Sequence, residues 1–151
     1  MSTAETVAVI MACHNRRDTS VRCLRALAAQ QEAGVSISLF VTDDGSTDGT
    51  VQAIQALWPG ATILAGDGSL YWAAAMALAE RQAVRQRPDY VLWLNDDTEL
   101  RPGAVRTLLE QAHVHPHAII VGATVSPTDG RVTYGGRRRI DDHPQRFRSL
   151  G

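Results

Sequence analysis

The stretch Asp89-Tyr-Val-Leu-Trp-Leu-Asn-Asp-Asp-Thr-Glu99 decides the fold of this chain. Its apolar residues, 90–94, run without alternation and predict a strand buried on both faces, as in a parallel sheet. The run ends in Asn95, Asp96 and Asp97. Unpaired carboxylates are too costly to bury inside such a strand, so we expect both Asp at its carboxyl end, where α/β sheets bind ligands. A solvated turn rich in Asp is the alternative interpretation.

Strand and helix patterns alternate along the whole chain around this stretch. Such alternation is typical of βαβ units. We therefore expect an α/β fold with a mostly parallel sheet and flanking helices, in one domain over residues 1–151. The predicted strands are 7–12, 35–42, 61–65, 90–94, 118–124 and 131–134, and the predicted helices are 18–31, one that ends at Leu57, 70–87 and one that begins at Pro102.

Small polar residues near the start of each helix predict N-terminal caps, because their side chains accept hydrogen bonds from free backbone N–H groups. Trp93 lies inside the apolar run, so we expect it in the core. The candidate caps of the first three helices are Asp18 or Thr19, Ser46 or Thr47, and Ser69.

The composition excludes several classes of protein. All fifteen basic residues are Arg, so the absence of Lys excludes a P-loop and Schiff-base chemistry. The net charge of −1 gives no reason to expect a nucleic-acid partner. No apolar run reaches the roughly 20 residues of a transmembrane segment, and residues 1–6 do not resemble a signal peptide. With only Cys13 and Cys23, the chain fits the reducing cytoplasm, and the inner face of the membrane is an alternative location.

Two pairs of acids follow predicted strands, Asp43 with Asp44 and Asp96 with Asp97. The carboxyl ends of parallel strands share one edge, so we expect both pairs to face one crevice together with the loop 13–17. Adjacent carboxylates need a counter-charge there, and a divalent metal that bridges to phosphates supplies it. A dinucleotide-binding loop is excluded, because no Gly follows the first predicted strand.

Three segments, in register, resemble the successive motifs of family 2 glycosyltransferases. The order, the spacing and the strand contexts agree, and the resemblance covers nearly the whole chain. Residues 66–72 and 133–139 further resemble a bacterial branch that includes rhamnosyltransferase-like enzymes. The three motifs are Val7-Ala-Val-Ile-Met-Ala-Cys-His-Asn-Arg16, Val41-Thr-Asp-Asp-Gly-Ser-Thr-Asp-Gly-Thr50 and Leu94-Asn-Asp-Asp-Thr98.

The resemblance implies the A-type glycosyltransferase fold, which binds a nucleotide-diphosphate sugar (here a UDP- or dTDP-sugar) with Mg²⁺ or Mn²⁺. By position, Asp44 matches the acid that recognises the nucleobase. Asp97 matches a metal ligand, and Asp96 matches a residue directed at the ribose or the metal. A carboxylate that accepts an imide N–H distinguishes uracil or thymine from cytosine. The resemblance also assigns Ala12, His14, Asn15 and Arg16 to the nucleotide.

A second group of residues is predicted to bind the sugar donor: Gly68, Tyr71 and Trp72. The two aromatic side chains stack on the nucleotide or sugar in one interpretation, and pack at a helix start in the other. Gly68 serves the backbone geometry, and a close approach to the donor is an additional role.

An inverting member of this family also needs a carboxylate that deprotonates the acceptor hydroxyl. The resemblance puts that residue beyond the last motif, and none of the later acids has its context, so no general base is evident. One hypothesis is the donor-binding N-terminal part of an inverting, metal-assisted glycosyltransferase, incomplete at its C-terminus, with a saccharide or lipid-linked acceptor. The other is a nucleotide-sugar-binding module without transfer chemistry. An incomplete fold would leave apolar faces bare, so a homodimer is a further expectation.

Overall fold

The computed structural model describes residues 4–31, 34–139 and 147–149 of the chain. Its backbone contacts divide the chain into two compact units, residues 1–102 and 103–151. The single domain expected over 1–151 stays a prediction.

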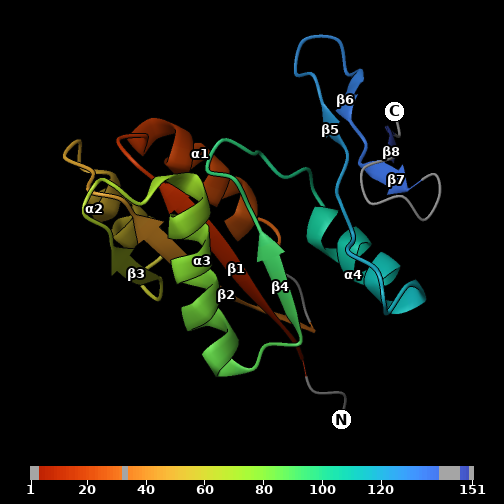
Figure 1. Ribbon diagram of the computed structural model, residues 1–151, viewed down its shortest axis with the longest axis horizontal. Helices are drawn as coiled ribbons and strands as arrows, with labels where there is room; N and C mark the ends of the chain where they lie inside the picture. Colours follow the sequence, from red (N-terminus) through yellow and green to blue (C-terminus); the bar gives the residue numbers. More distant parts are fainter. Residues whose placement is uncertain (1–3, 32–33, 140–146, 150–151) are drawn as a thin grey trace. The chain divides into compact units, whose positions relative to one another are not determined.

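The first unit is built on a four-stranded sheet in which every neighbouring pair of strands is parallel (Figure 1). The strand order is β3-β2-β1-β4, as predicted for an α/β fold with crossover helices. The strands are β1 (Glu5–Cys13), β2 (Val35–Asp43), β3 (Thr62–Ala65) and β4 (Tyr90–Trp93), and the helices are α1 (Arg17–Ala28), α2 (Thr50–Leu57), α3 (Tyr71–Ala83) and the 3₁₀ helix η1 (Val84–Gln86).

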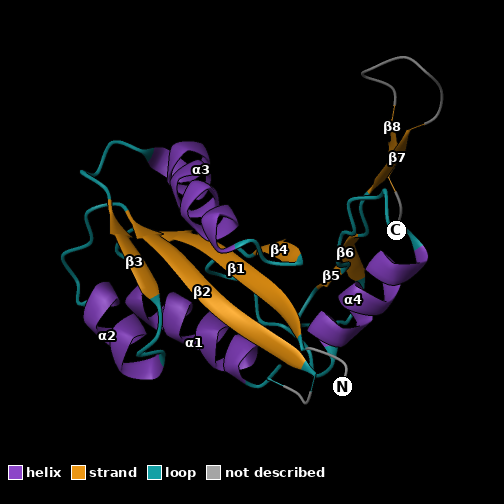
Figure 2. Cartoon of the chain, turned by 90° about the horizontal axis from the view of Figure 1, so that it is seen from below, coloured by secondary structure: helices purple, strands orange, loops and turns teal. Residues whose placement is uncertain are grey.

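Helix α3 covers one face of the sheet, and α1 and α2 cover the other (Figure 2). Towards α3, alternate residues of β1 and a residue of β2 form a cluster with the inner side of the helix. The helix contributes mostly Ala at intervals of four residues, which lets its backbone lie close to the sheet. The buried cluster is Ala8, Ile10, Phe40, Met76, Ala79 and Ala83.

The intervening residues of β1 and β2 face the other way, because successive side chains of a strand point to opposite faces. They are fully buried, as are the inner residues of α1 and α2 that lie on that side of the sheet. This second core comprises Val7, Val9, Met11, Leu39 and Val41 of the strands with Cys23, Leu24, Leu27 and Ile54 of the helices.

Strand β4 differs from its prediction. Tyr90, Val91 and Leu92 are half-buried, and Trp93, expected in the core, is 50% exposed. Among the described residues β4 pairs only with β1, so its second edge carries no neighbour. An apolar run without alternation predicts a strand but not its place in the sheet, and burial on both faces is therefore wrong here.

The expected caps are also wrong for all three helices. The residues that precede α1, α2 and α3 are Arg16, Gly49 and Leu70, and none of them accepts a cap hydrogen bond with its side chain. At α2, the carboxylate of Asp48 accepts the N–H of Thr50 at 3.0 Å, and Gly49 between them has a positive φ of 85°.

The second unit contains helix α4 (Ala104–Val114) and two antiparallel strand pairs: β5 (Thr124–Val125) with β6 (Val132–Tyr134), and β7 (Arg137–Arg139) with β8 (Phe147–Ser149). The prediction of a strand at 131–134 is confirmed. The strand predicted at 118–124 is wrong, because residues 118–123 pair with no described strand and Ile119 is 93% exposed. An apolar run becomes a strand only where a partner satisfies its backbone groups.

Candidate functional site

The carboxyl edge of the sheet brings together three polar segments that lie far apart in the sequence. Cys13, the last residue of β1, pairs with Asp43 at the end of β2, and the N–H of Asp44 donates to the Cys13 carbonyl at 2.9 Å. On the other side of β1, Leu94 donates to Ile10 at 3.0 Å and leads the chain into Asn95–Asp97. Both acidic pairs therefore lie at the edge where ligands of α/β sheets bind.

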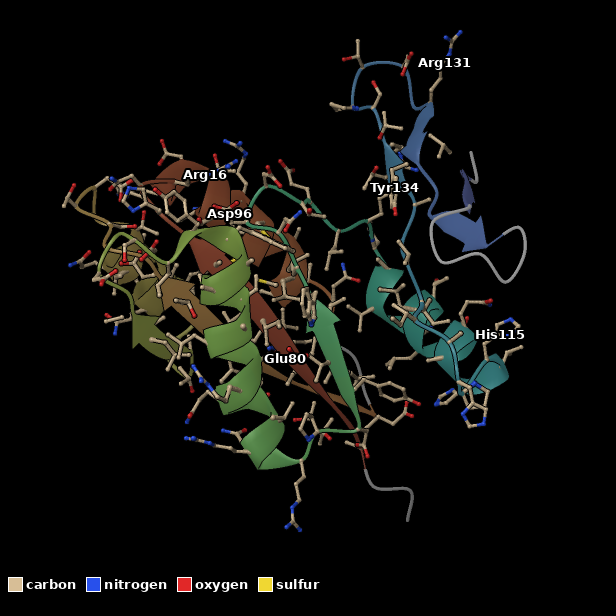
Figure 3. The ribbon with its side chains drawn as sticks, viewed as in Figure 1. Arg16, Glu80, Asp96, His115, Arg131 and Tyr134 are labelled. Carbon is tan, nitrogen blue, oxygen red and sulfur yellow. The ribbon has the colours of Figure 1, made fainter. Side chains whose placement is uncertain are left out.

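Arg16 joins the loop after β1 to the two acids after β4 (Figure 3). Its Nε lies 3.2 Å from Oδ2 of Asp96, and its Nη2 donates to Oδ2 of Asp97 at 3.1 Å. The planar guanidinium presents several donors in a fixed fork, so one Arg side chain contacts both carboxylates at once.

The two carboxylates have different surroundings. The Asp96 side chain is 9% exposed, whereas that of Asp97 is 52% exposed. Burial raises the pKa of Asp96 most, and the charge of Asp97 raises it further, while the positive charge of Arg16 lowers it. The contact with Arg16 lacks hydrogen-bond geometry at Oδ2 of Asp96, so this buried oxygen keeps an unused acceptor site.

Asp44 is buried at the base of the edge and holds the loop that leads into α3. Its Oδ1 accepts the N–H of Gly68 at 2.8 Å, and its Oδ2 accepts the N–H of Tyr71 at 3.0 Å. A Cβ on Gly66 would lie 2.4 Å from Oδ1 of Asp44, so only glycine leaves room for the carboxylate. Asp44 thus replaces the predicted cap, Ser69, as the acceptor at the start of α3. A carboxylate has about four acceptor sites, so these two bonds do not exhaust the acceptor capacity of Asp44.

The loop after β1 is tied to the loop after β2 by His14 and Asn15. The ring Nδ1–H of His14 donates to the carbonyl of Asp44, and Nε2 accepts from the amide of Asn15 at 3.2 Å. Asn15 has a positive φ of 51°, and its side-chain oxygen accepts the N–H of Thr47 at 2.8 Å. Its own N–H donates to Ser46 Oγ at 2.8 Å. Ser46 and Thr47, predicted as caps, therefore fasten this loop instead.

The aromatic candidates lie at the start of α3, next to the acids. Trp72 donates from Nε1 to Oδ1 of Asn95 at 3.1 Å and meets Trp93 edge to face, with ring centroids 6.0 Å apart. Tyr71 is 81% exposed and has a positive φ of 54°. The interpretation that these aromatics pack at a helix start is wrong for Tyr71, whose side chain is largely exposed. The ligand-stacking role of Tyr71 and Trp72 stays a prediction, and the sequence did not single out Trp93 as their neighbour.

Ala12 and Gly68 complete the set of predicted site residues. Ala12 lies near the end of β1, half-buried, and packs against the cluster beneath α3. Gly68 has a φ of 90°, and the backbone N–H that it gives to Asp44 supports the predicted geometric role.

The residues at this edge fit a divalent metal that is shared with a ligand. In the described ranges, no group of three or more His, Cys, Asp or Glu side chains is arranged to hold a metal. Asp96 and Asp97 supply two hard oxygen donors, and the buried oxygen of Asp96 has no hydrogen bond. Mg²⁺ and Mn²⁺ need more oxygens than these, which suits a metal that also binds phosphates and water.

Residues 8–151 match the family model described as glycosyl transferase family 2. The chain is also similar to N-acetylglucosaminyl-diphospho-decaprenol L-rhamnosyltransferase of Mycobacterium tuberculosis, with 31% identity over 125 residues, in the two strains CDC 1551 and H37Rv. That similarity covers 78% of this chain, and the chain spans 40% of the length of these curated relatives.

Solved structures resemble the fold. S. aureus TarS 1-349 in complex with UDP-GlcNAc matches with a TM-score of 0.65 and 20% identity, over 74% of this chain and 32% of the 1-349 chain. The mannosyltransferase PcManGT from Pyrobaculum calidifontis, in complex with GDP-Man and Mn²⁺, matches with a TM-score of 0.62 and 24% identity, over 85% of this chain and 38% of that one. The likeness confirms the expected A-type glycosyltransferase fold.

Proposed function

Because this chain belongs to glycosyl transferase family 2, we propose that it binds a nucleotide-diphosphate sugar at the carboxyl edge of its parallel sheet. We further propose that it takes part in the transfer of this sugar to an acceptor hydroxyl. The observation that carries the proposal is the convergence of Asp44, Arg16, Asp96 and Asp97 from three separate loops. Acids and a guanidinium gathered at one edge match the charge pattern of a base, a diphosphate and a metal.

Asp44 reads the nucleobase in this proposal. Its carboxylate is held rigidly by the N–H groups of Gly68 and Tyr71 and keeps acceptor capacity for an imide N–H. A rigid acceptor selects uracil or thymine, so the donor is a UDP- or dTDP-sugar. Tyr71, whose backbone N–H binds this carboxylate, has an exposed side chain that offers a stacking surface for the base or the sugar.

Asp97, with Asp96 behind it, holds Mg²⁺ or Mn²⁺ together with the diphosphate. The metal neutralises the charge that develops on the departing diphosphate. The exposure of Asp97 and the unused oxygen of Asp96 support this assignment, and PcManGT binds GDP-Man with Mn²⁺.

The acceptor is a saccharide or a lipid-linked saccharide, and transfer inverts the anomeric centre. The name of the mycobacterial relative describes a diphospho-decaprenol acceptor, which supports the lipid-linked alternative. No helix in the described part of the chain is long and apolar enough to cross a membrane. We propose that the reaction takes place in the cytoplasm, at the inner face of the membrane if the acceptor is lipid-linked.

Calorimetric titration with UDP and with dTDP, in the presence and absence of Mn²⁺, tests the donor site. We expect binding that Mn²⁺ strengthens, and a loss of about tenfold or more in affinity for Asp97→Ala. Glu80→Gln is the matched control, since Glu80 lies along α3, away from Arg16 and Asp96 (Figure 3). Absence of nucleotide binding, or binding that Asp97→Ala leaves unchanged, would exclude the donor site.

A second candidate function, a binding module without transfer chemistry, is favoured by one observation. Within the ranges that the structure describes, each acid at this edge already contacts another group of the protein, and Asp44 and Asp96, which keep acceptor capacity, are the ones assigned above to the nucleobase and the metal. Asp43 contacts Cys13 and Ser46, Asp44 holds the α3 loop, Asp96 and Asp97 contact Arg16, and Glu99 pairs with Arg22. Release of UDP or dTDP from a matching donor by the purified chain would exclude this candidate.

A further inference from the structure

The guanidinium of Arg16 takes the position of a bridging cation between two carboxylates. It lies 3.2 Å from Oδ2 of Asp96 and 3.1 Å from Oδ2 of Asp97, so each carboxylate directs an oxygen at the same charged group. Neighbouring carboxylates repel each other unless a cation lies between them. Arg16 provides such a cation for Asp96 and Asp97.

A divalent metal bound by the same two oxygens would need the space and the charge balance that Arg16 now provides. Two carboxylates carry two negative charges, and a guanidinium together with a divalent ion would bring three positive charges against them. Like charges at such short range repel strongly in a partly buried site. As long as no diphosphate adds negative charge, the metal and Arg16 therefore compete for the two carboxylates.

Arg16 can leave without disturbing the fold around it. Its backbone lies between Asn15, which is fastened to Ser46 and Thr47, and the first residue of α1. Its side chain is 46% exposed, so the guanidinium has solvent to move into. A diphosphate next to the metal offers it a replacement partner, because guanidinium groups bind phosphate oxygens in a bidentate way.

We propose that Arg16 is a built-in counter-ion that the divalent metal must displace, and that the nucleotide diphosphate promotes the displacement by binding the released guanidinium. This inference rests on the proposed donor site. The metal alone then binds weakly, because it competes with a tethered cation, whereas metal and nucleotide together bind synergistically. By linkage, the factor by which UDP raises the affinity for Mn²⁺ equals the factor by which Mn²⁺ raises the affinity for UDP.

Electron paramagnetic resonance of free Mn²⁺, titrated with the 151-residue chain in the absence and presence of UDP, measures this competition without requiring activity. For Arg16→Gln we expect Mn²⁺ alone to bind at least about threefold more tightly than to the wild type, since the competing ion pair is lost. The gain in Mn²⁺ affinity on adding UDP shrinks in the same variant. Arg16→Lys gives an intermediate result, because one ammonium is a point charge and spans the two carboxylates less well.

Arg17→Gln is the matched control for loss of positive charge, because its guanidinium contacts neither Asp96 nor Asp97 in the structure. Equal effects of Arg16→Gln and Arg17→Gln, or no tightening with Arg16→Gln, would overturn the proposal. Circular dichroism verifies that the variants are folded, and Arg16→Lys keeps the test decisive if Arg16→Gln unfolds. If UDP with Mn²⁺ binds neither the wild type nor any variant, the donor site itself is wrong. If UDP with Mn²⁺ binds the wild type, but the affinity for Mn²⁺ alone does not change with the residue at position 16, only the counter-ion role is wrong.

Discussion

Asp44 shows how much a single side chain can organise at this edge. Its two oxygens hold N–H groups 24 and 27 residues later in the chain, and its carbonyl accepts from His14. The carboxylate fits only because position 66 has no Cβ. Three loops therefore depend on one buried acid and one glycine.

Gly66→Ala is expected to disturb this arrangement. The new Cβ would lie 2.4 Å from Oδ1 of Asp44, 2.8 Å from Leu70 and 3.0 Å from the Cα of Asp44, and backbone atoms cannot move aside easily. We expect a loss of roughly 1–3 kcal/mol in the free energy of unfolding, measured in urea, and weaker UDP binding. Gly60→Ala is the control, because a Cβ at Gly60 meets nothing within 4 Å. Equal stabilities of the two variants would contradict the crowding argument.

The two thiols are expected to be inert in the folded chain. Burial, followed by the charge of Asp96, raises the pKa of Cys23 to about 12, and burial, followed by the charge of Asp43, raises that of Cys13. At pH 8 we expect iodoacetamide to modify both at least about a hundredfold more slowly than in the urea-unfolded chain. Mass spectrometry of the labelled chain measures the two rates separately.

The sign of the pH dependence follows from the direction of these shifts. The folded chain holds the thiol protons more tightly than the unfolded chain does, so the thiols stabilise the fold fully below the unfolded pKa. That contribution is lost as the pH rises from about 9 towards 12. Native Cys23 that reacts at pH 8 as fast as in the unfolded chain would contradict this prediction.

Sequence reasoning found most of the residues that gather at the edge but not their bonds. The motifs identified Asp44, Asp96 and Asp97, because acids after apolar runs are visible in sequence. The hydrogen bonds of Asp44 to the α3 loop were not visible, since they span more than twenty residues and use backbone donors. The pairing of Arg16 with both acids was missed for the same reason, because only folding brings the loops after β1 and β4 together.

At the scale of elements, α3 is a helix whose inner side is built from small residues. Ala75, Ala79 and Ala83 are buried, whereas Ala77 on the same helix is exposed. The sequence predicted a helix over residues 70–87, and the structure confirms it between Tyr71 and Ala83. The sequence did not reveal which Ala residues face the sheet, because an Ala-rich helix has little contrast between its sides.

Ala79→Leu tests this contact. Ala79 is fully buried in the cluster with Ile10 and Phe40, so a larger side chain must force α3 and the sheet apart. We expect the free energy of unfolding to fall by roughly 1–3 kcal/mol. Ala77→Leu, at the exposed position, should change it by no more than about 0.5 kcal/mol. Denaturant titrations followed by circular dichroism compare the two variants. A larger loss of unfolding free energy with Ala77→Leu would mean that the side of α3 that carries Ala77, and not Ala79, faces the sheet.

The two apolar runs whose structure was predicted wrongly differ from the prediction for one reason. Residues 90–94 and 118–124 are both apolar runs, yet Trp93 is half exposed and residues 118–123 form no strand. Hydrophobicity predicts that a segment prefers burial, but burial depends on which neighbours its backbone and side chains find. The alternation of strands and helices in residues 5–93 needs no such knowledge and was predicted well.

At the scale of the whole molecule, every candidate site residue lies in the first unit, residues 1–102. The cluster under α3 is also formed only by residues of that unit. We therefore expect a chain of residues 1–102 to fold cooperatively by itself and to bind UDP with Mn²⁺ within about threefold of the affinity of the 151-residue chain. Thermal unfolding and calorimetry test both statements, and a shortened chain that folds but does not bind UDP would assign part of the site to residues 103–151.

The hydrogen bonds between Asp44 and the start of α3 also limit how this chain can be recombined with its homologues. A designer who exchanges the 66–71 loop between homologues to alter donor preference would separate the carboxylate from the glycine that accommodates it and from the amides that orient it. The smallest graft that keeps these partners together is the continuous stretch from residue 43 to residue 71. Shuffling libraries with crossovers inside that stretch should yield mostly misfolded chimeras, whereas crossovers on either side should preserve folding.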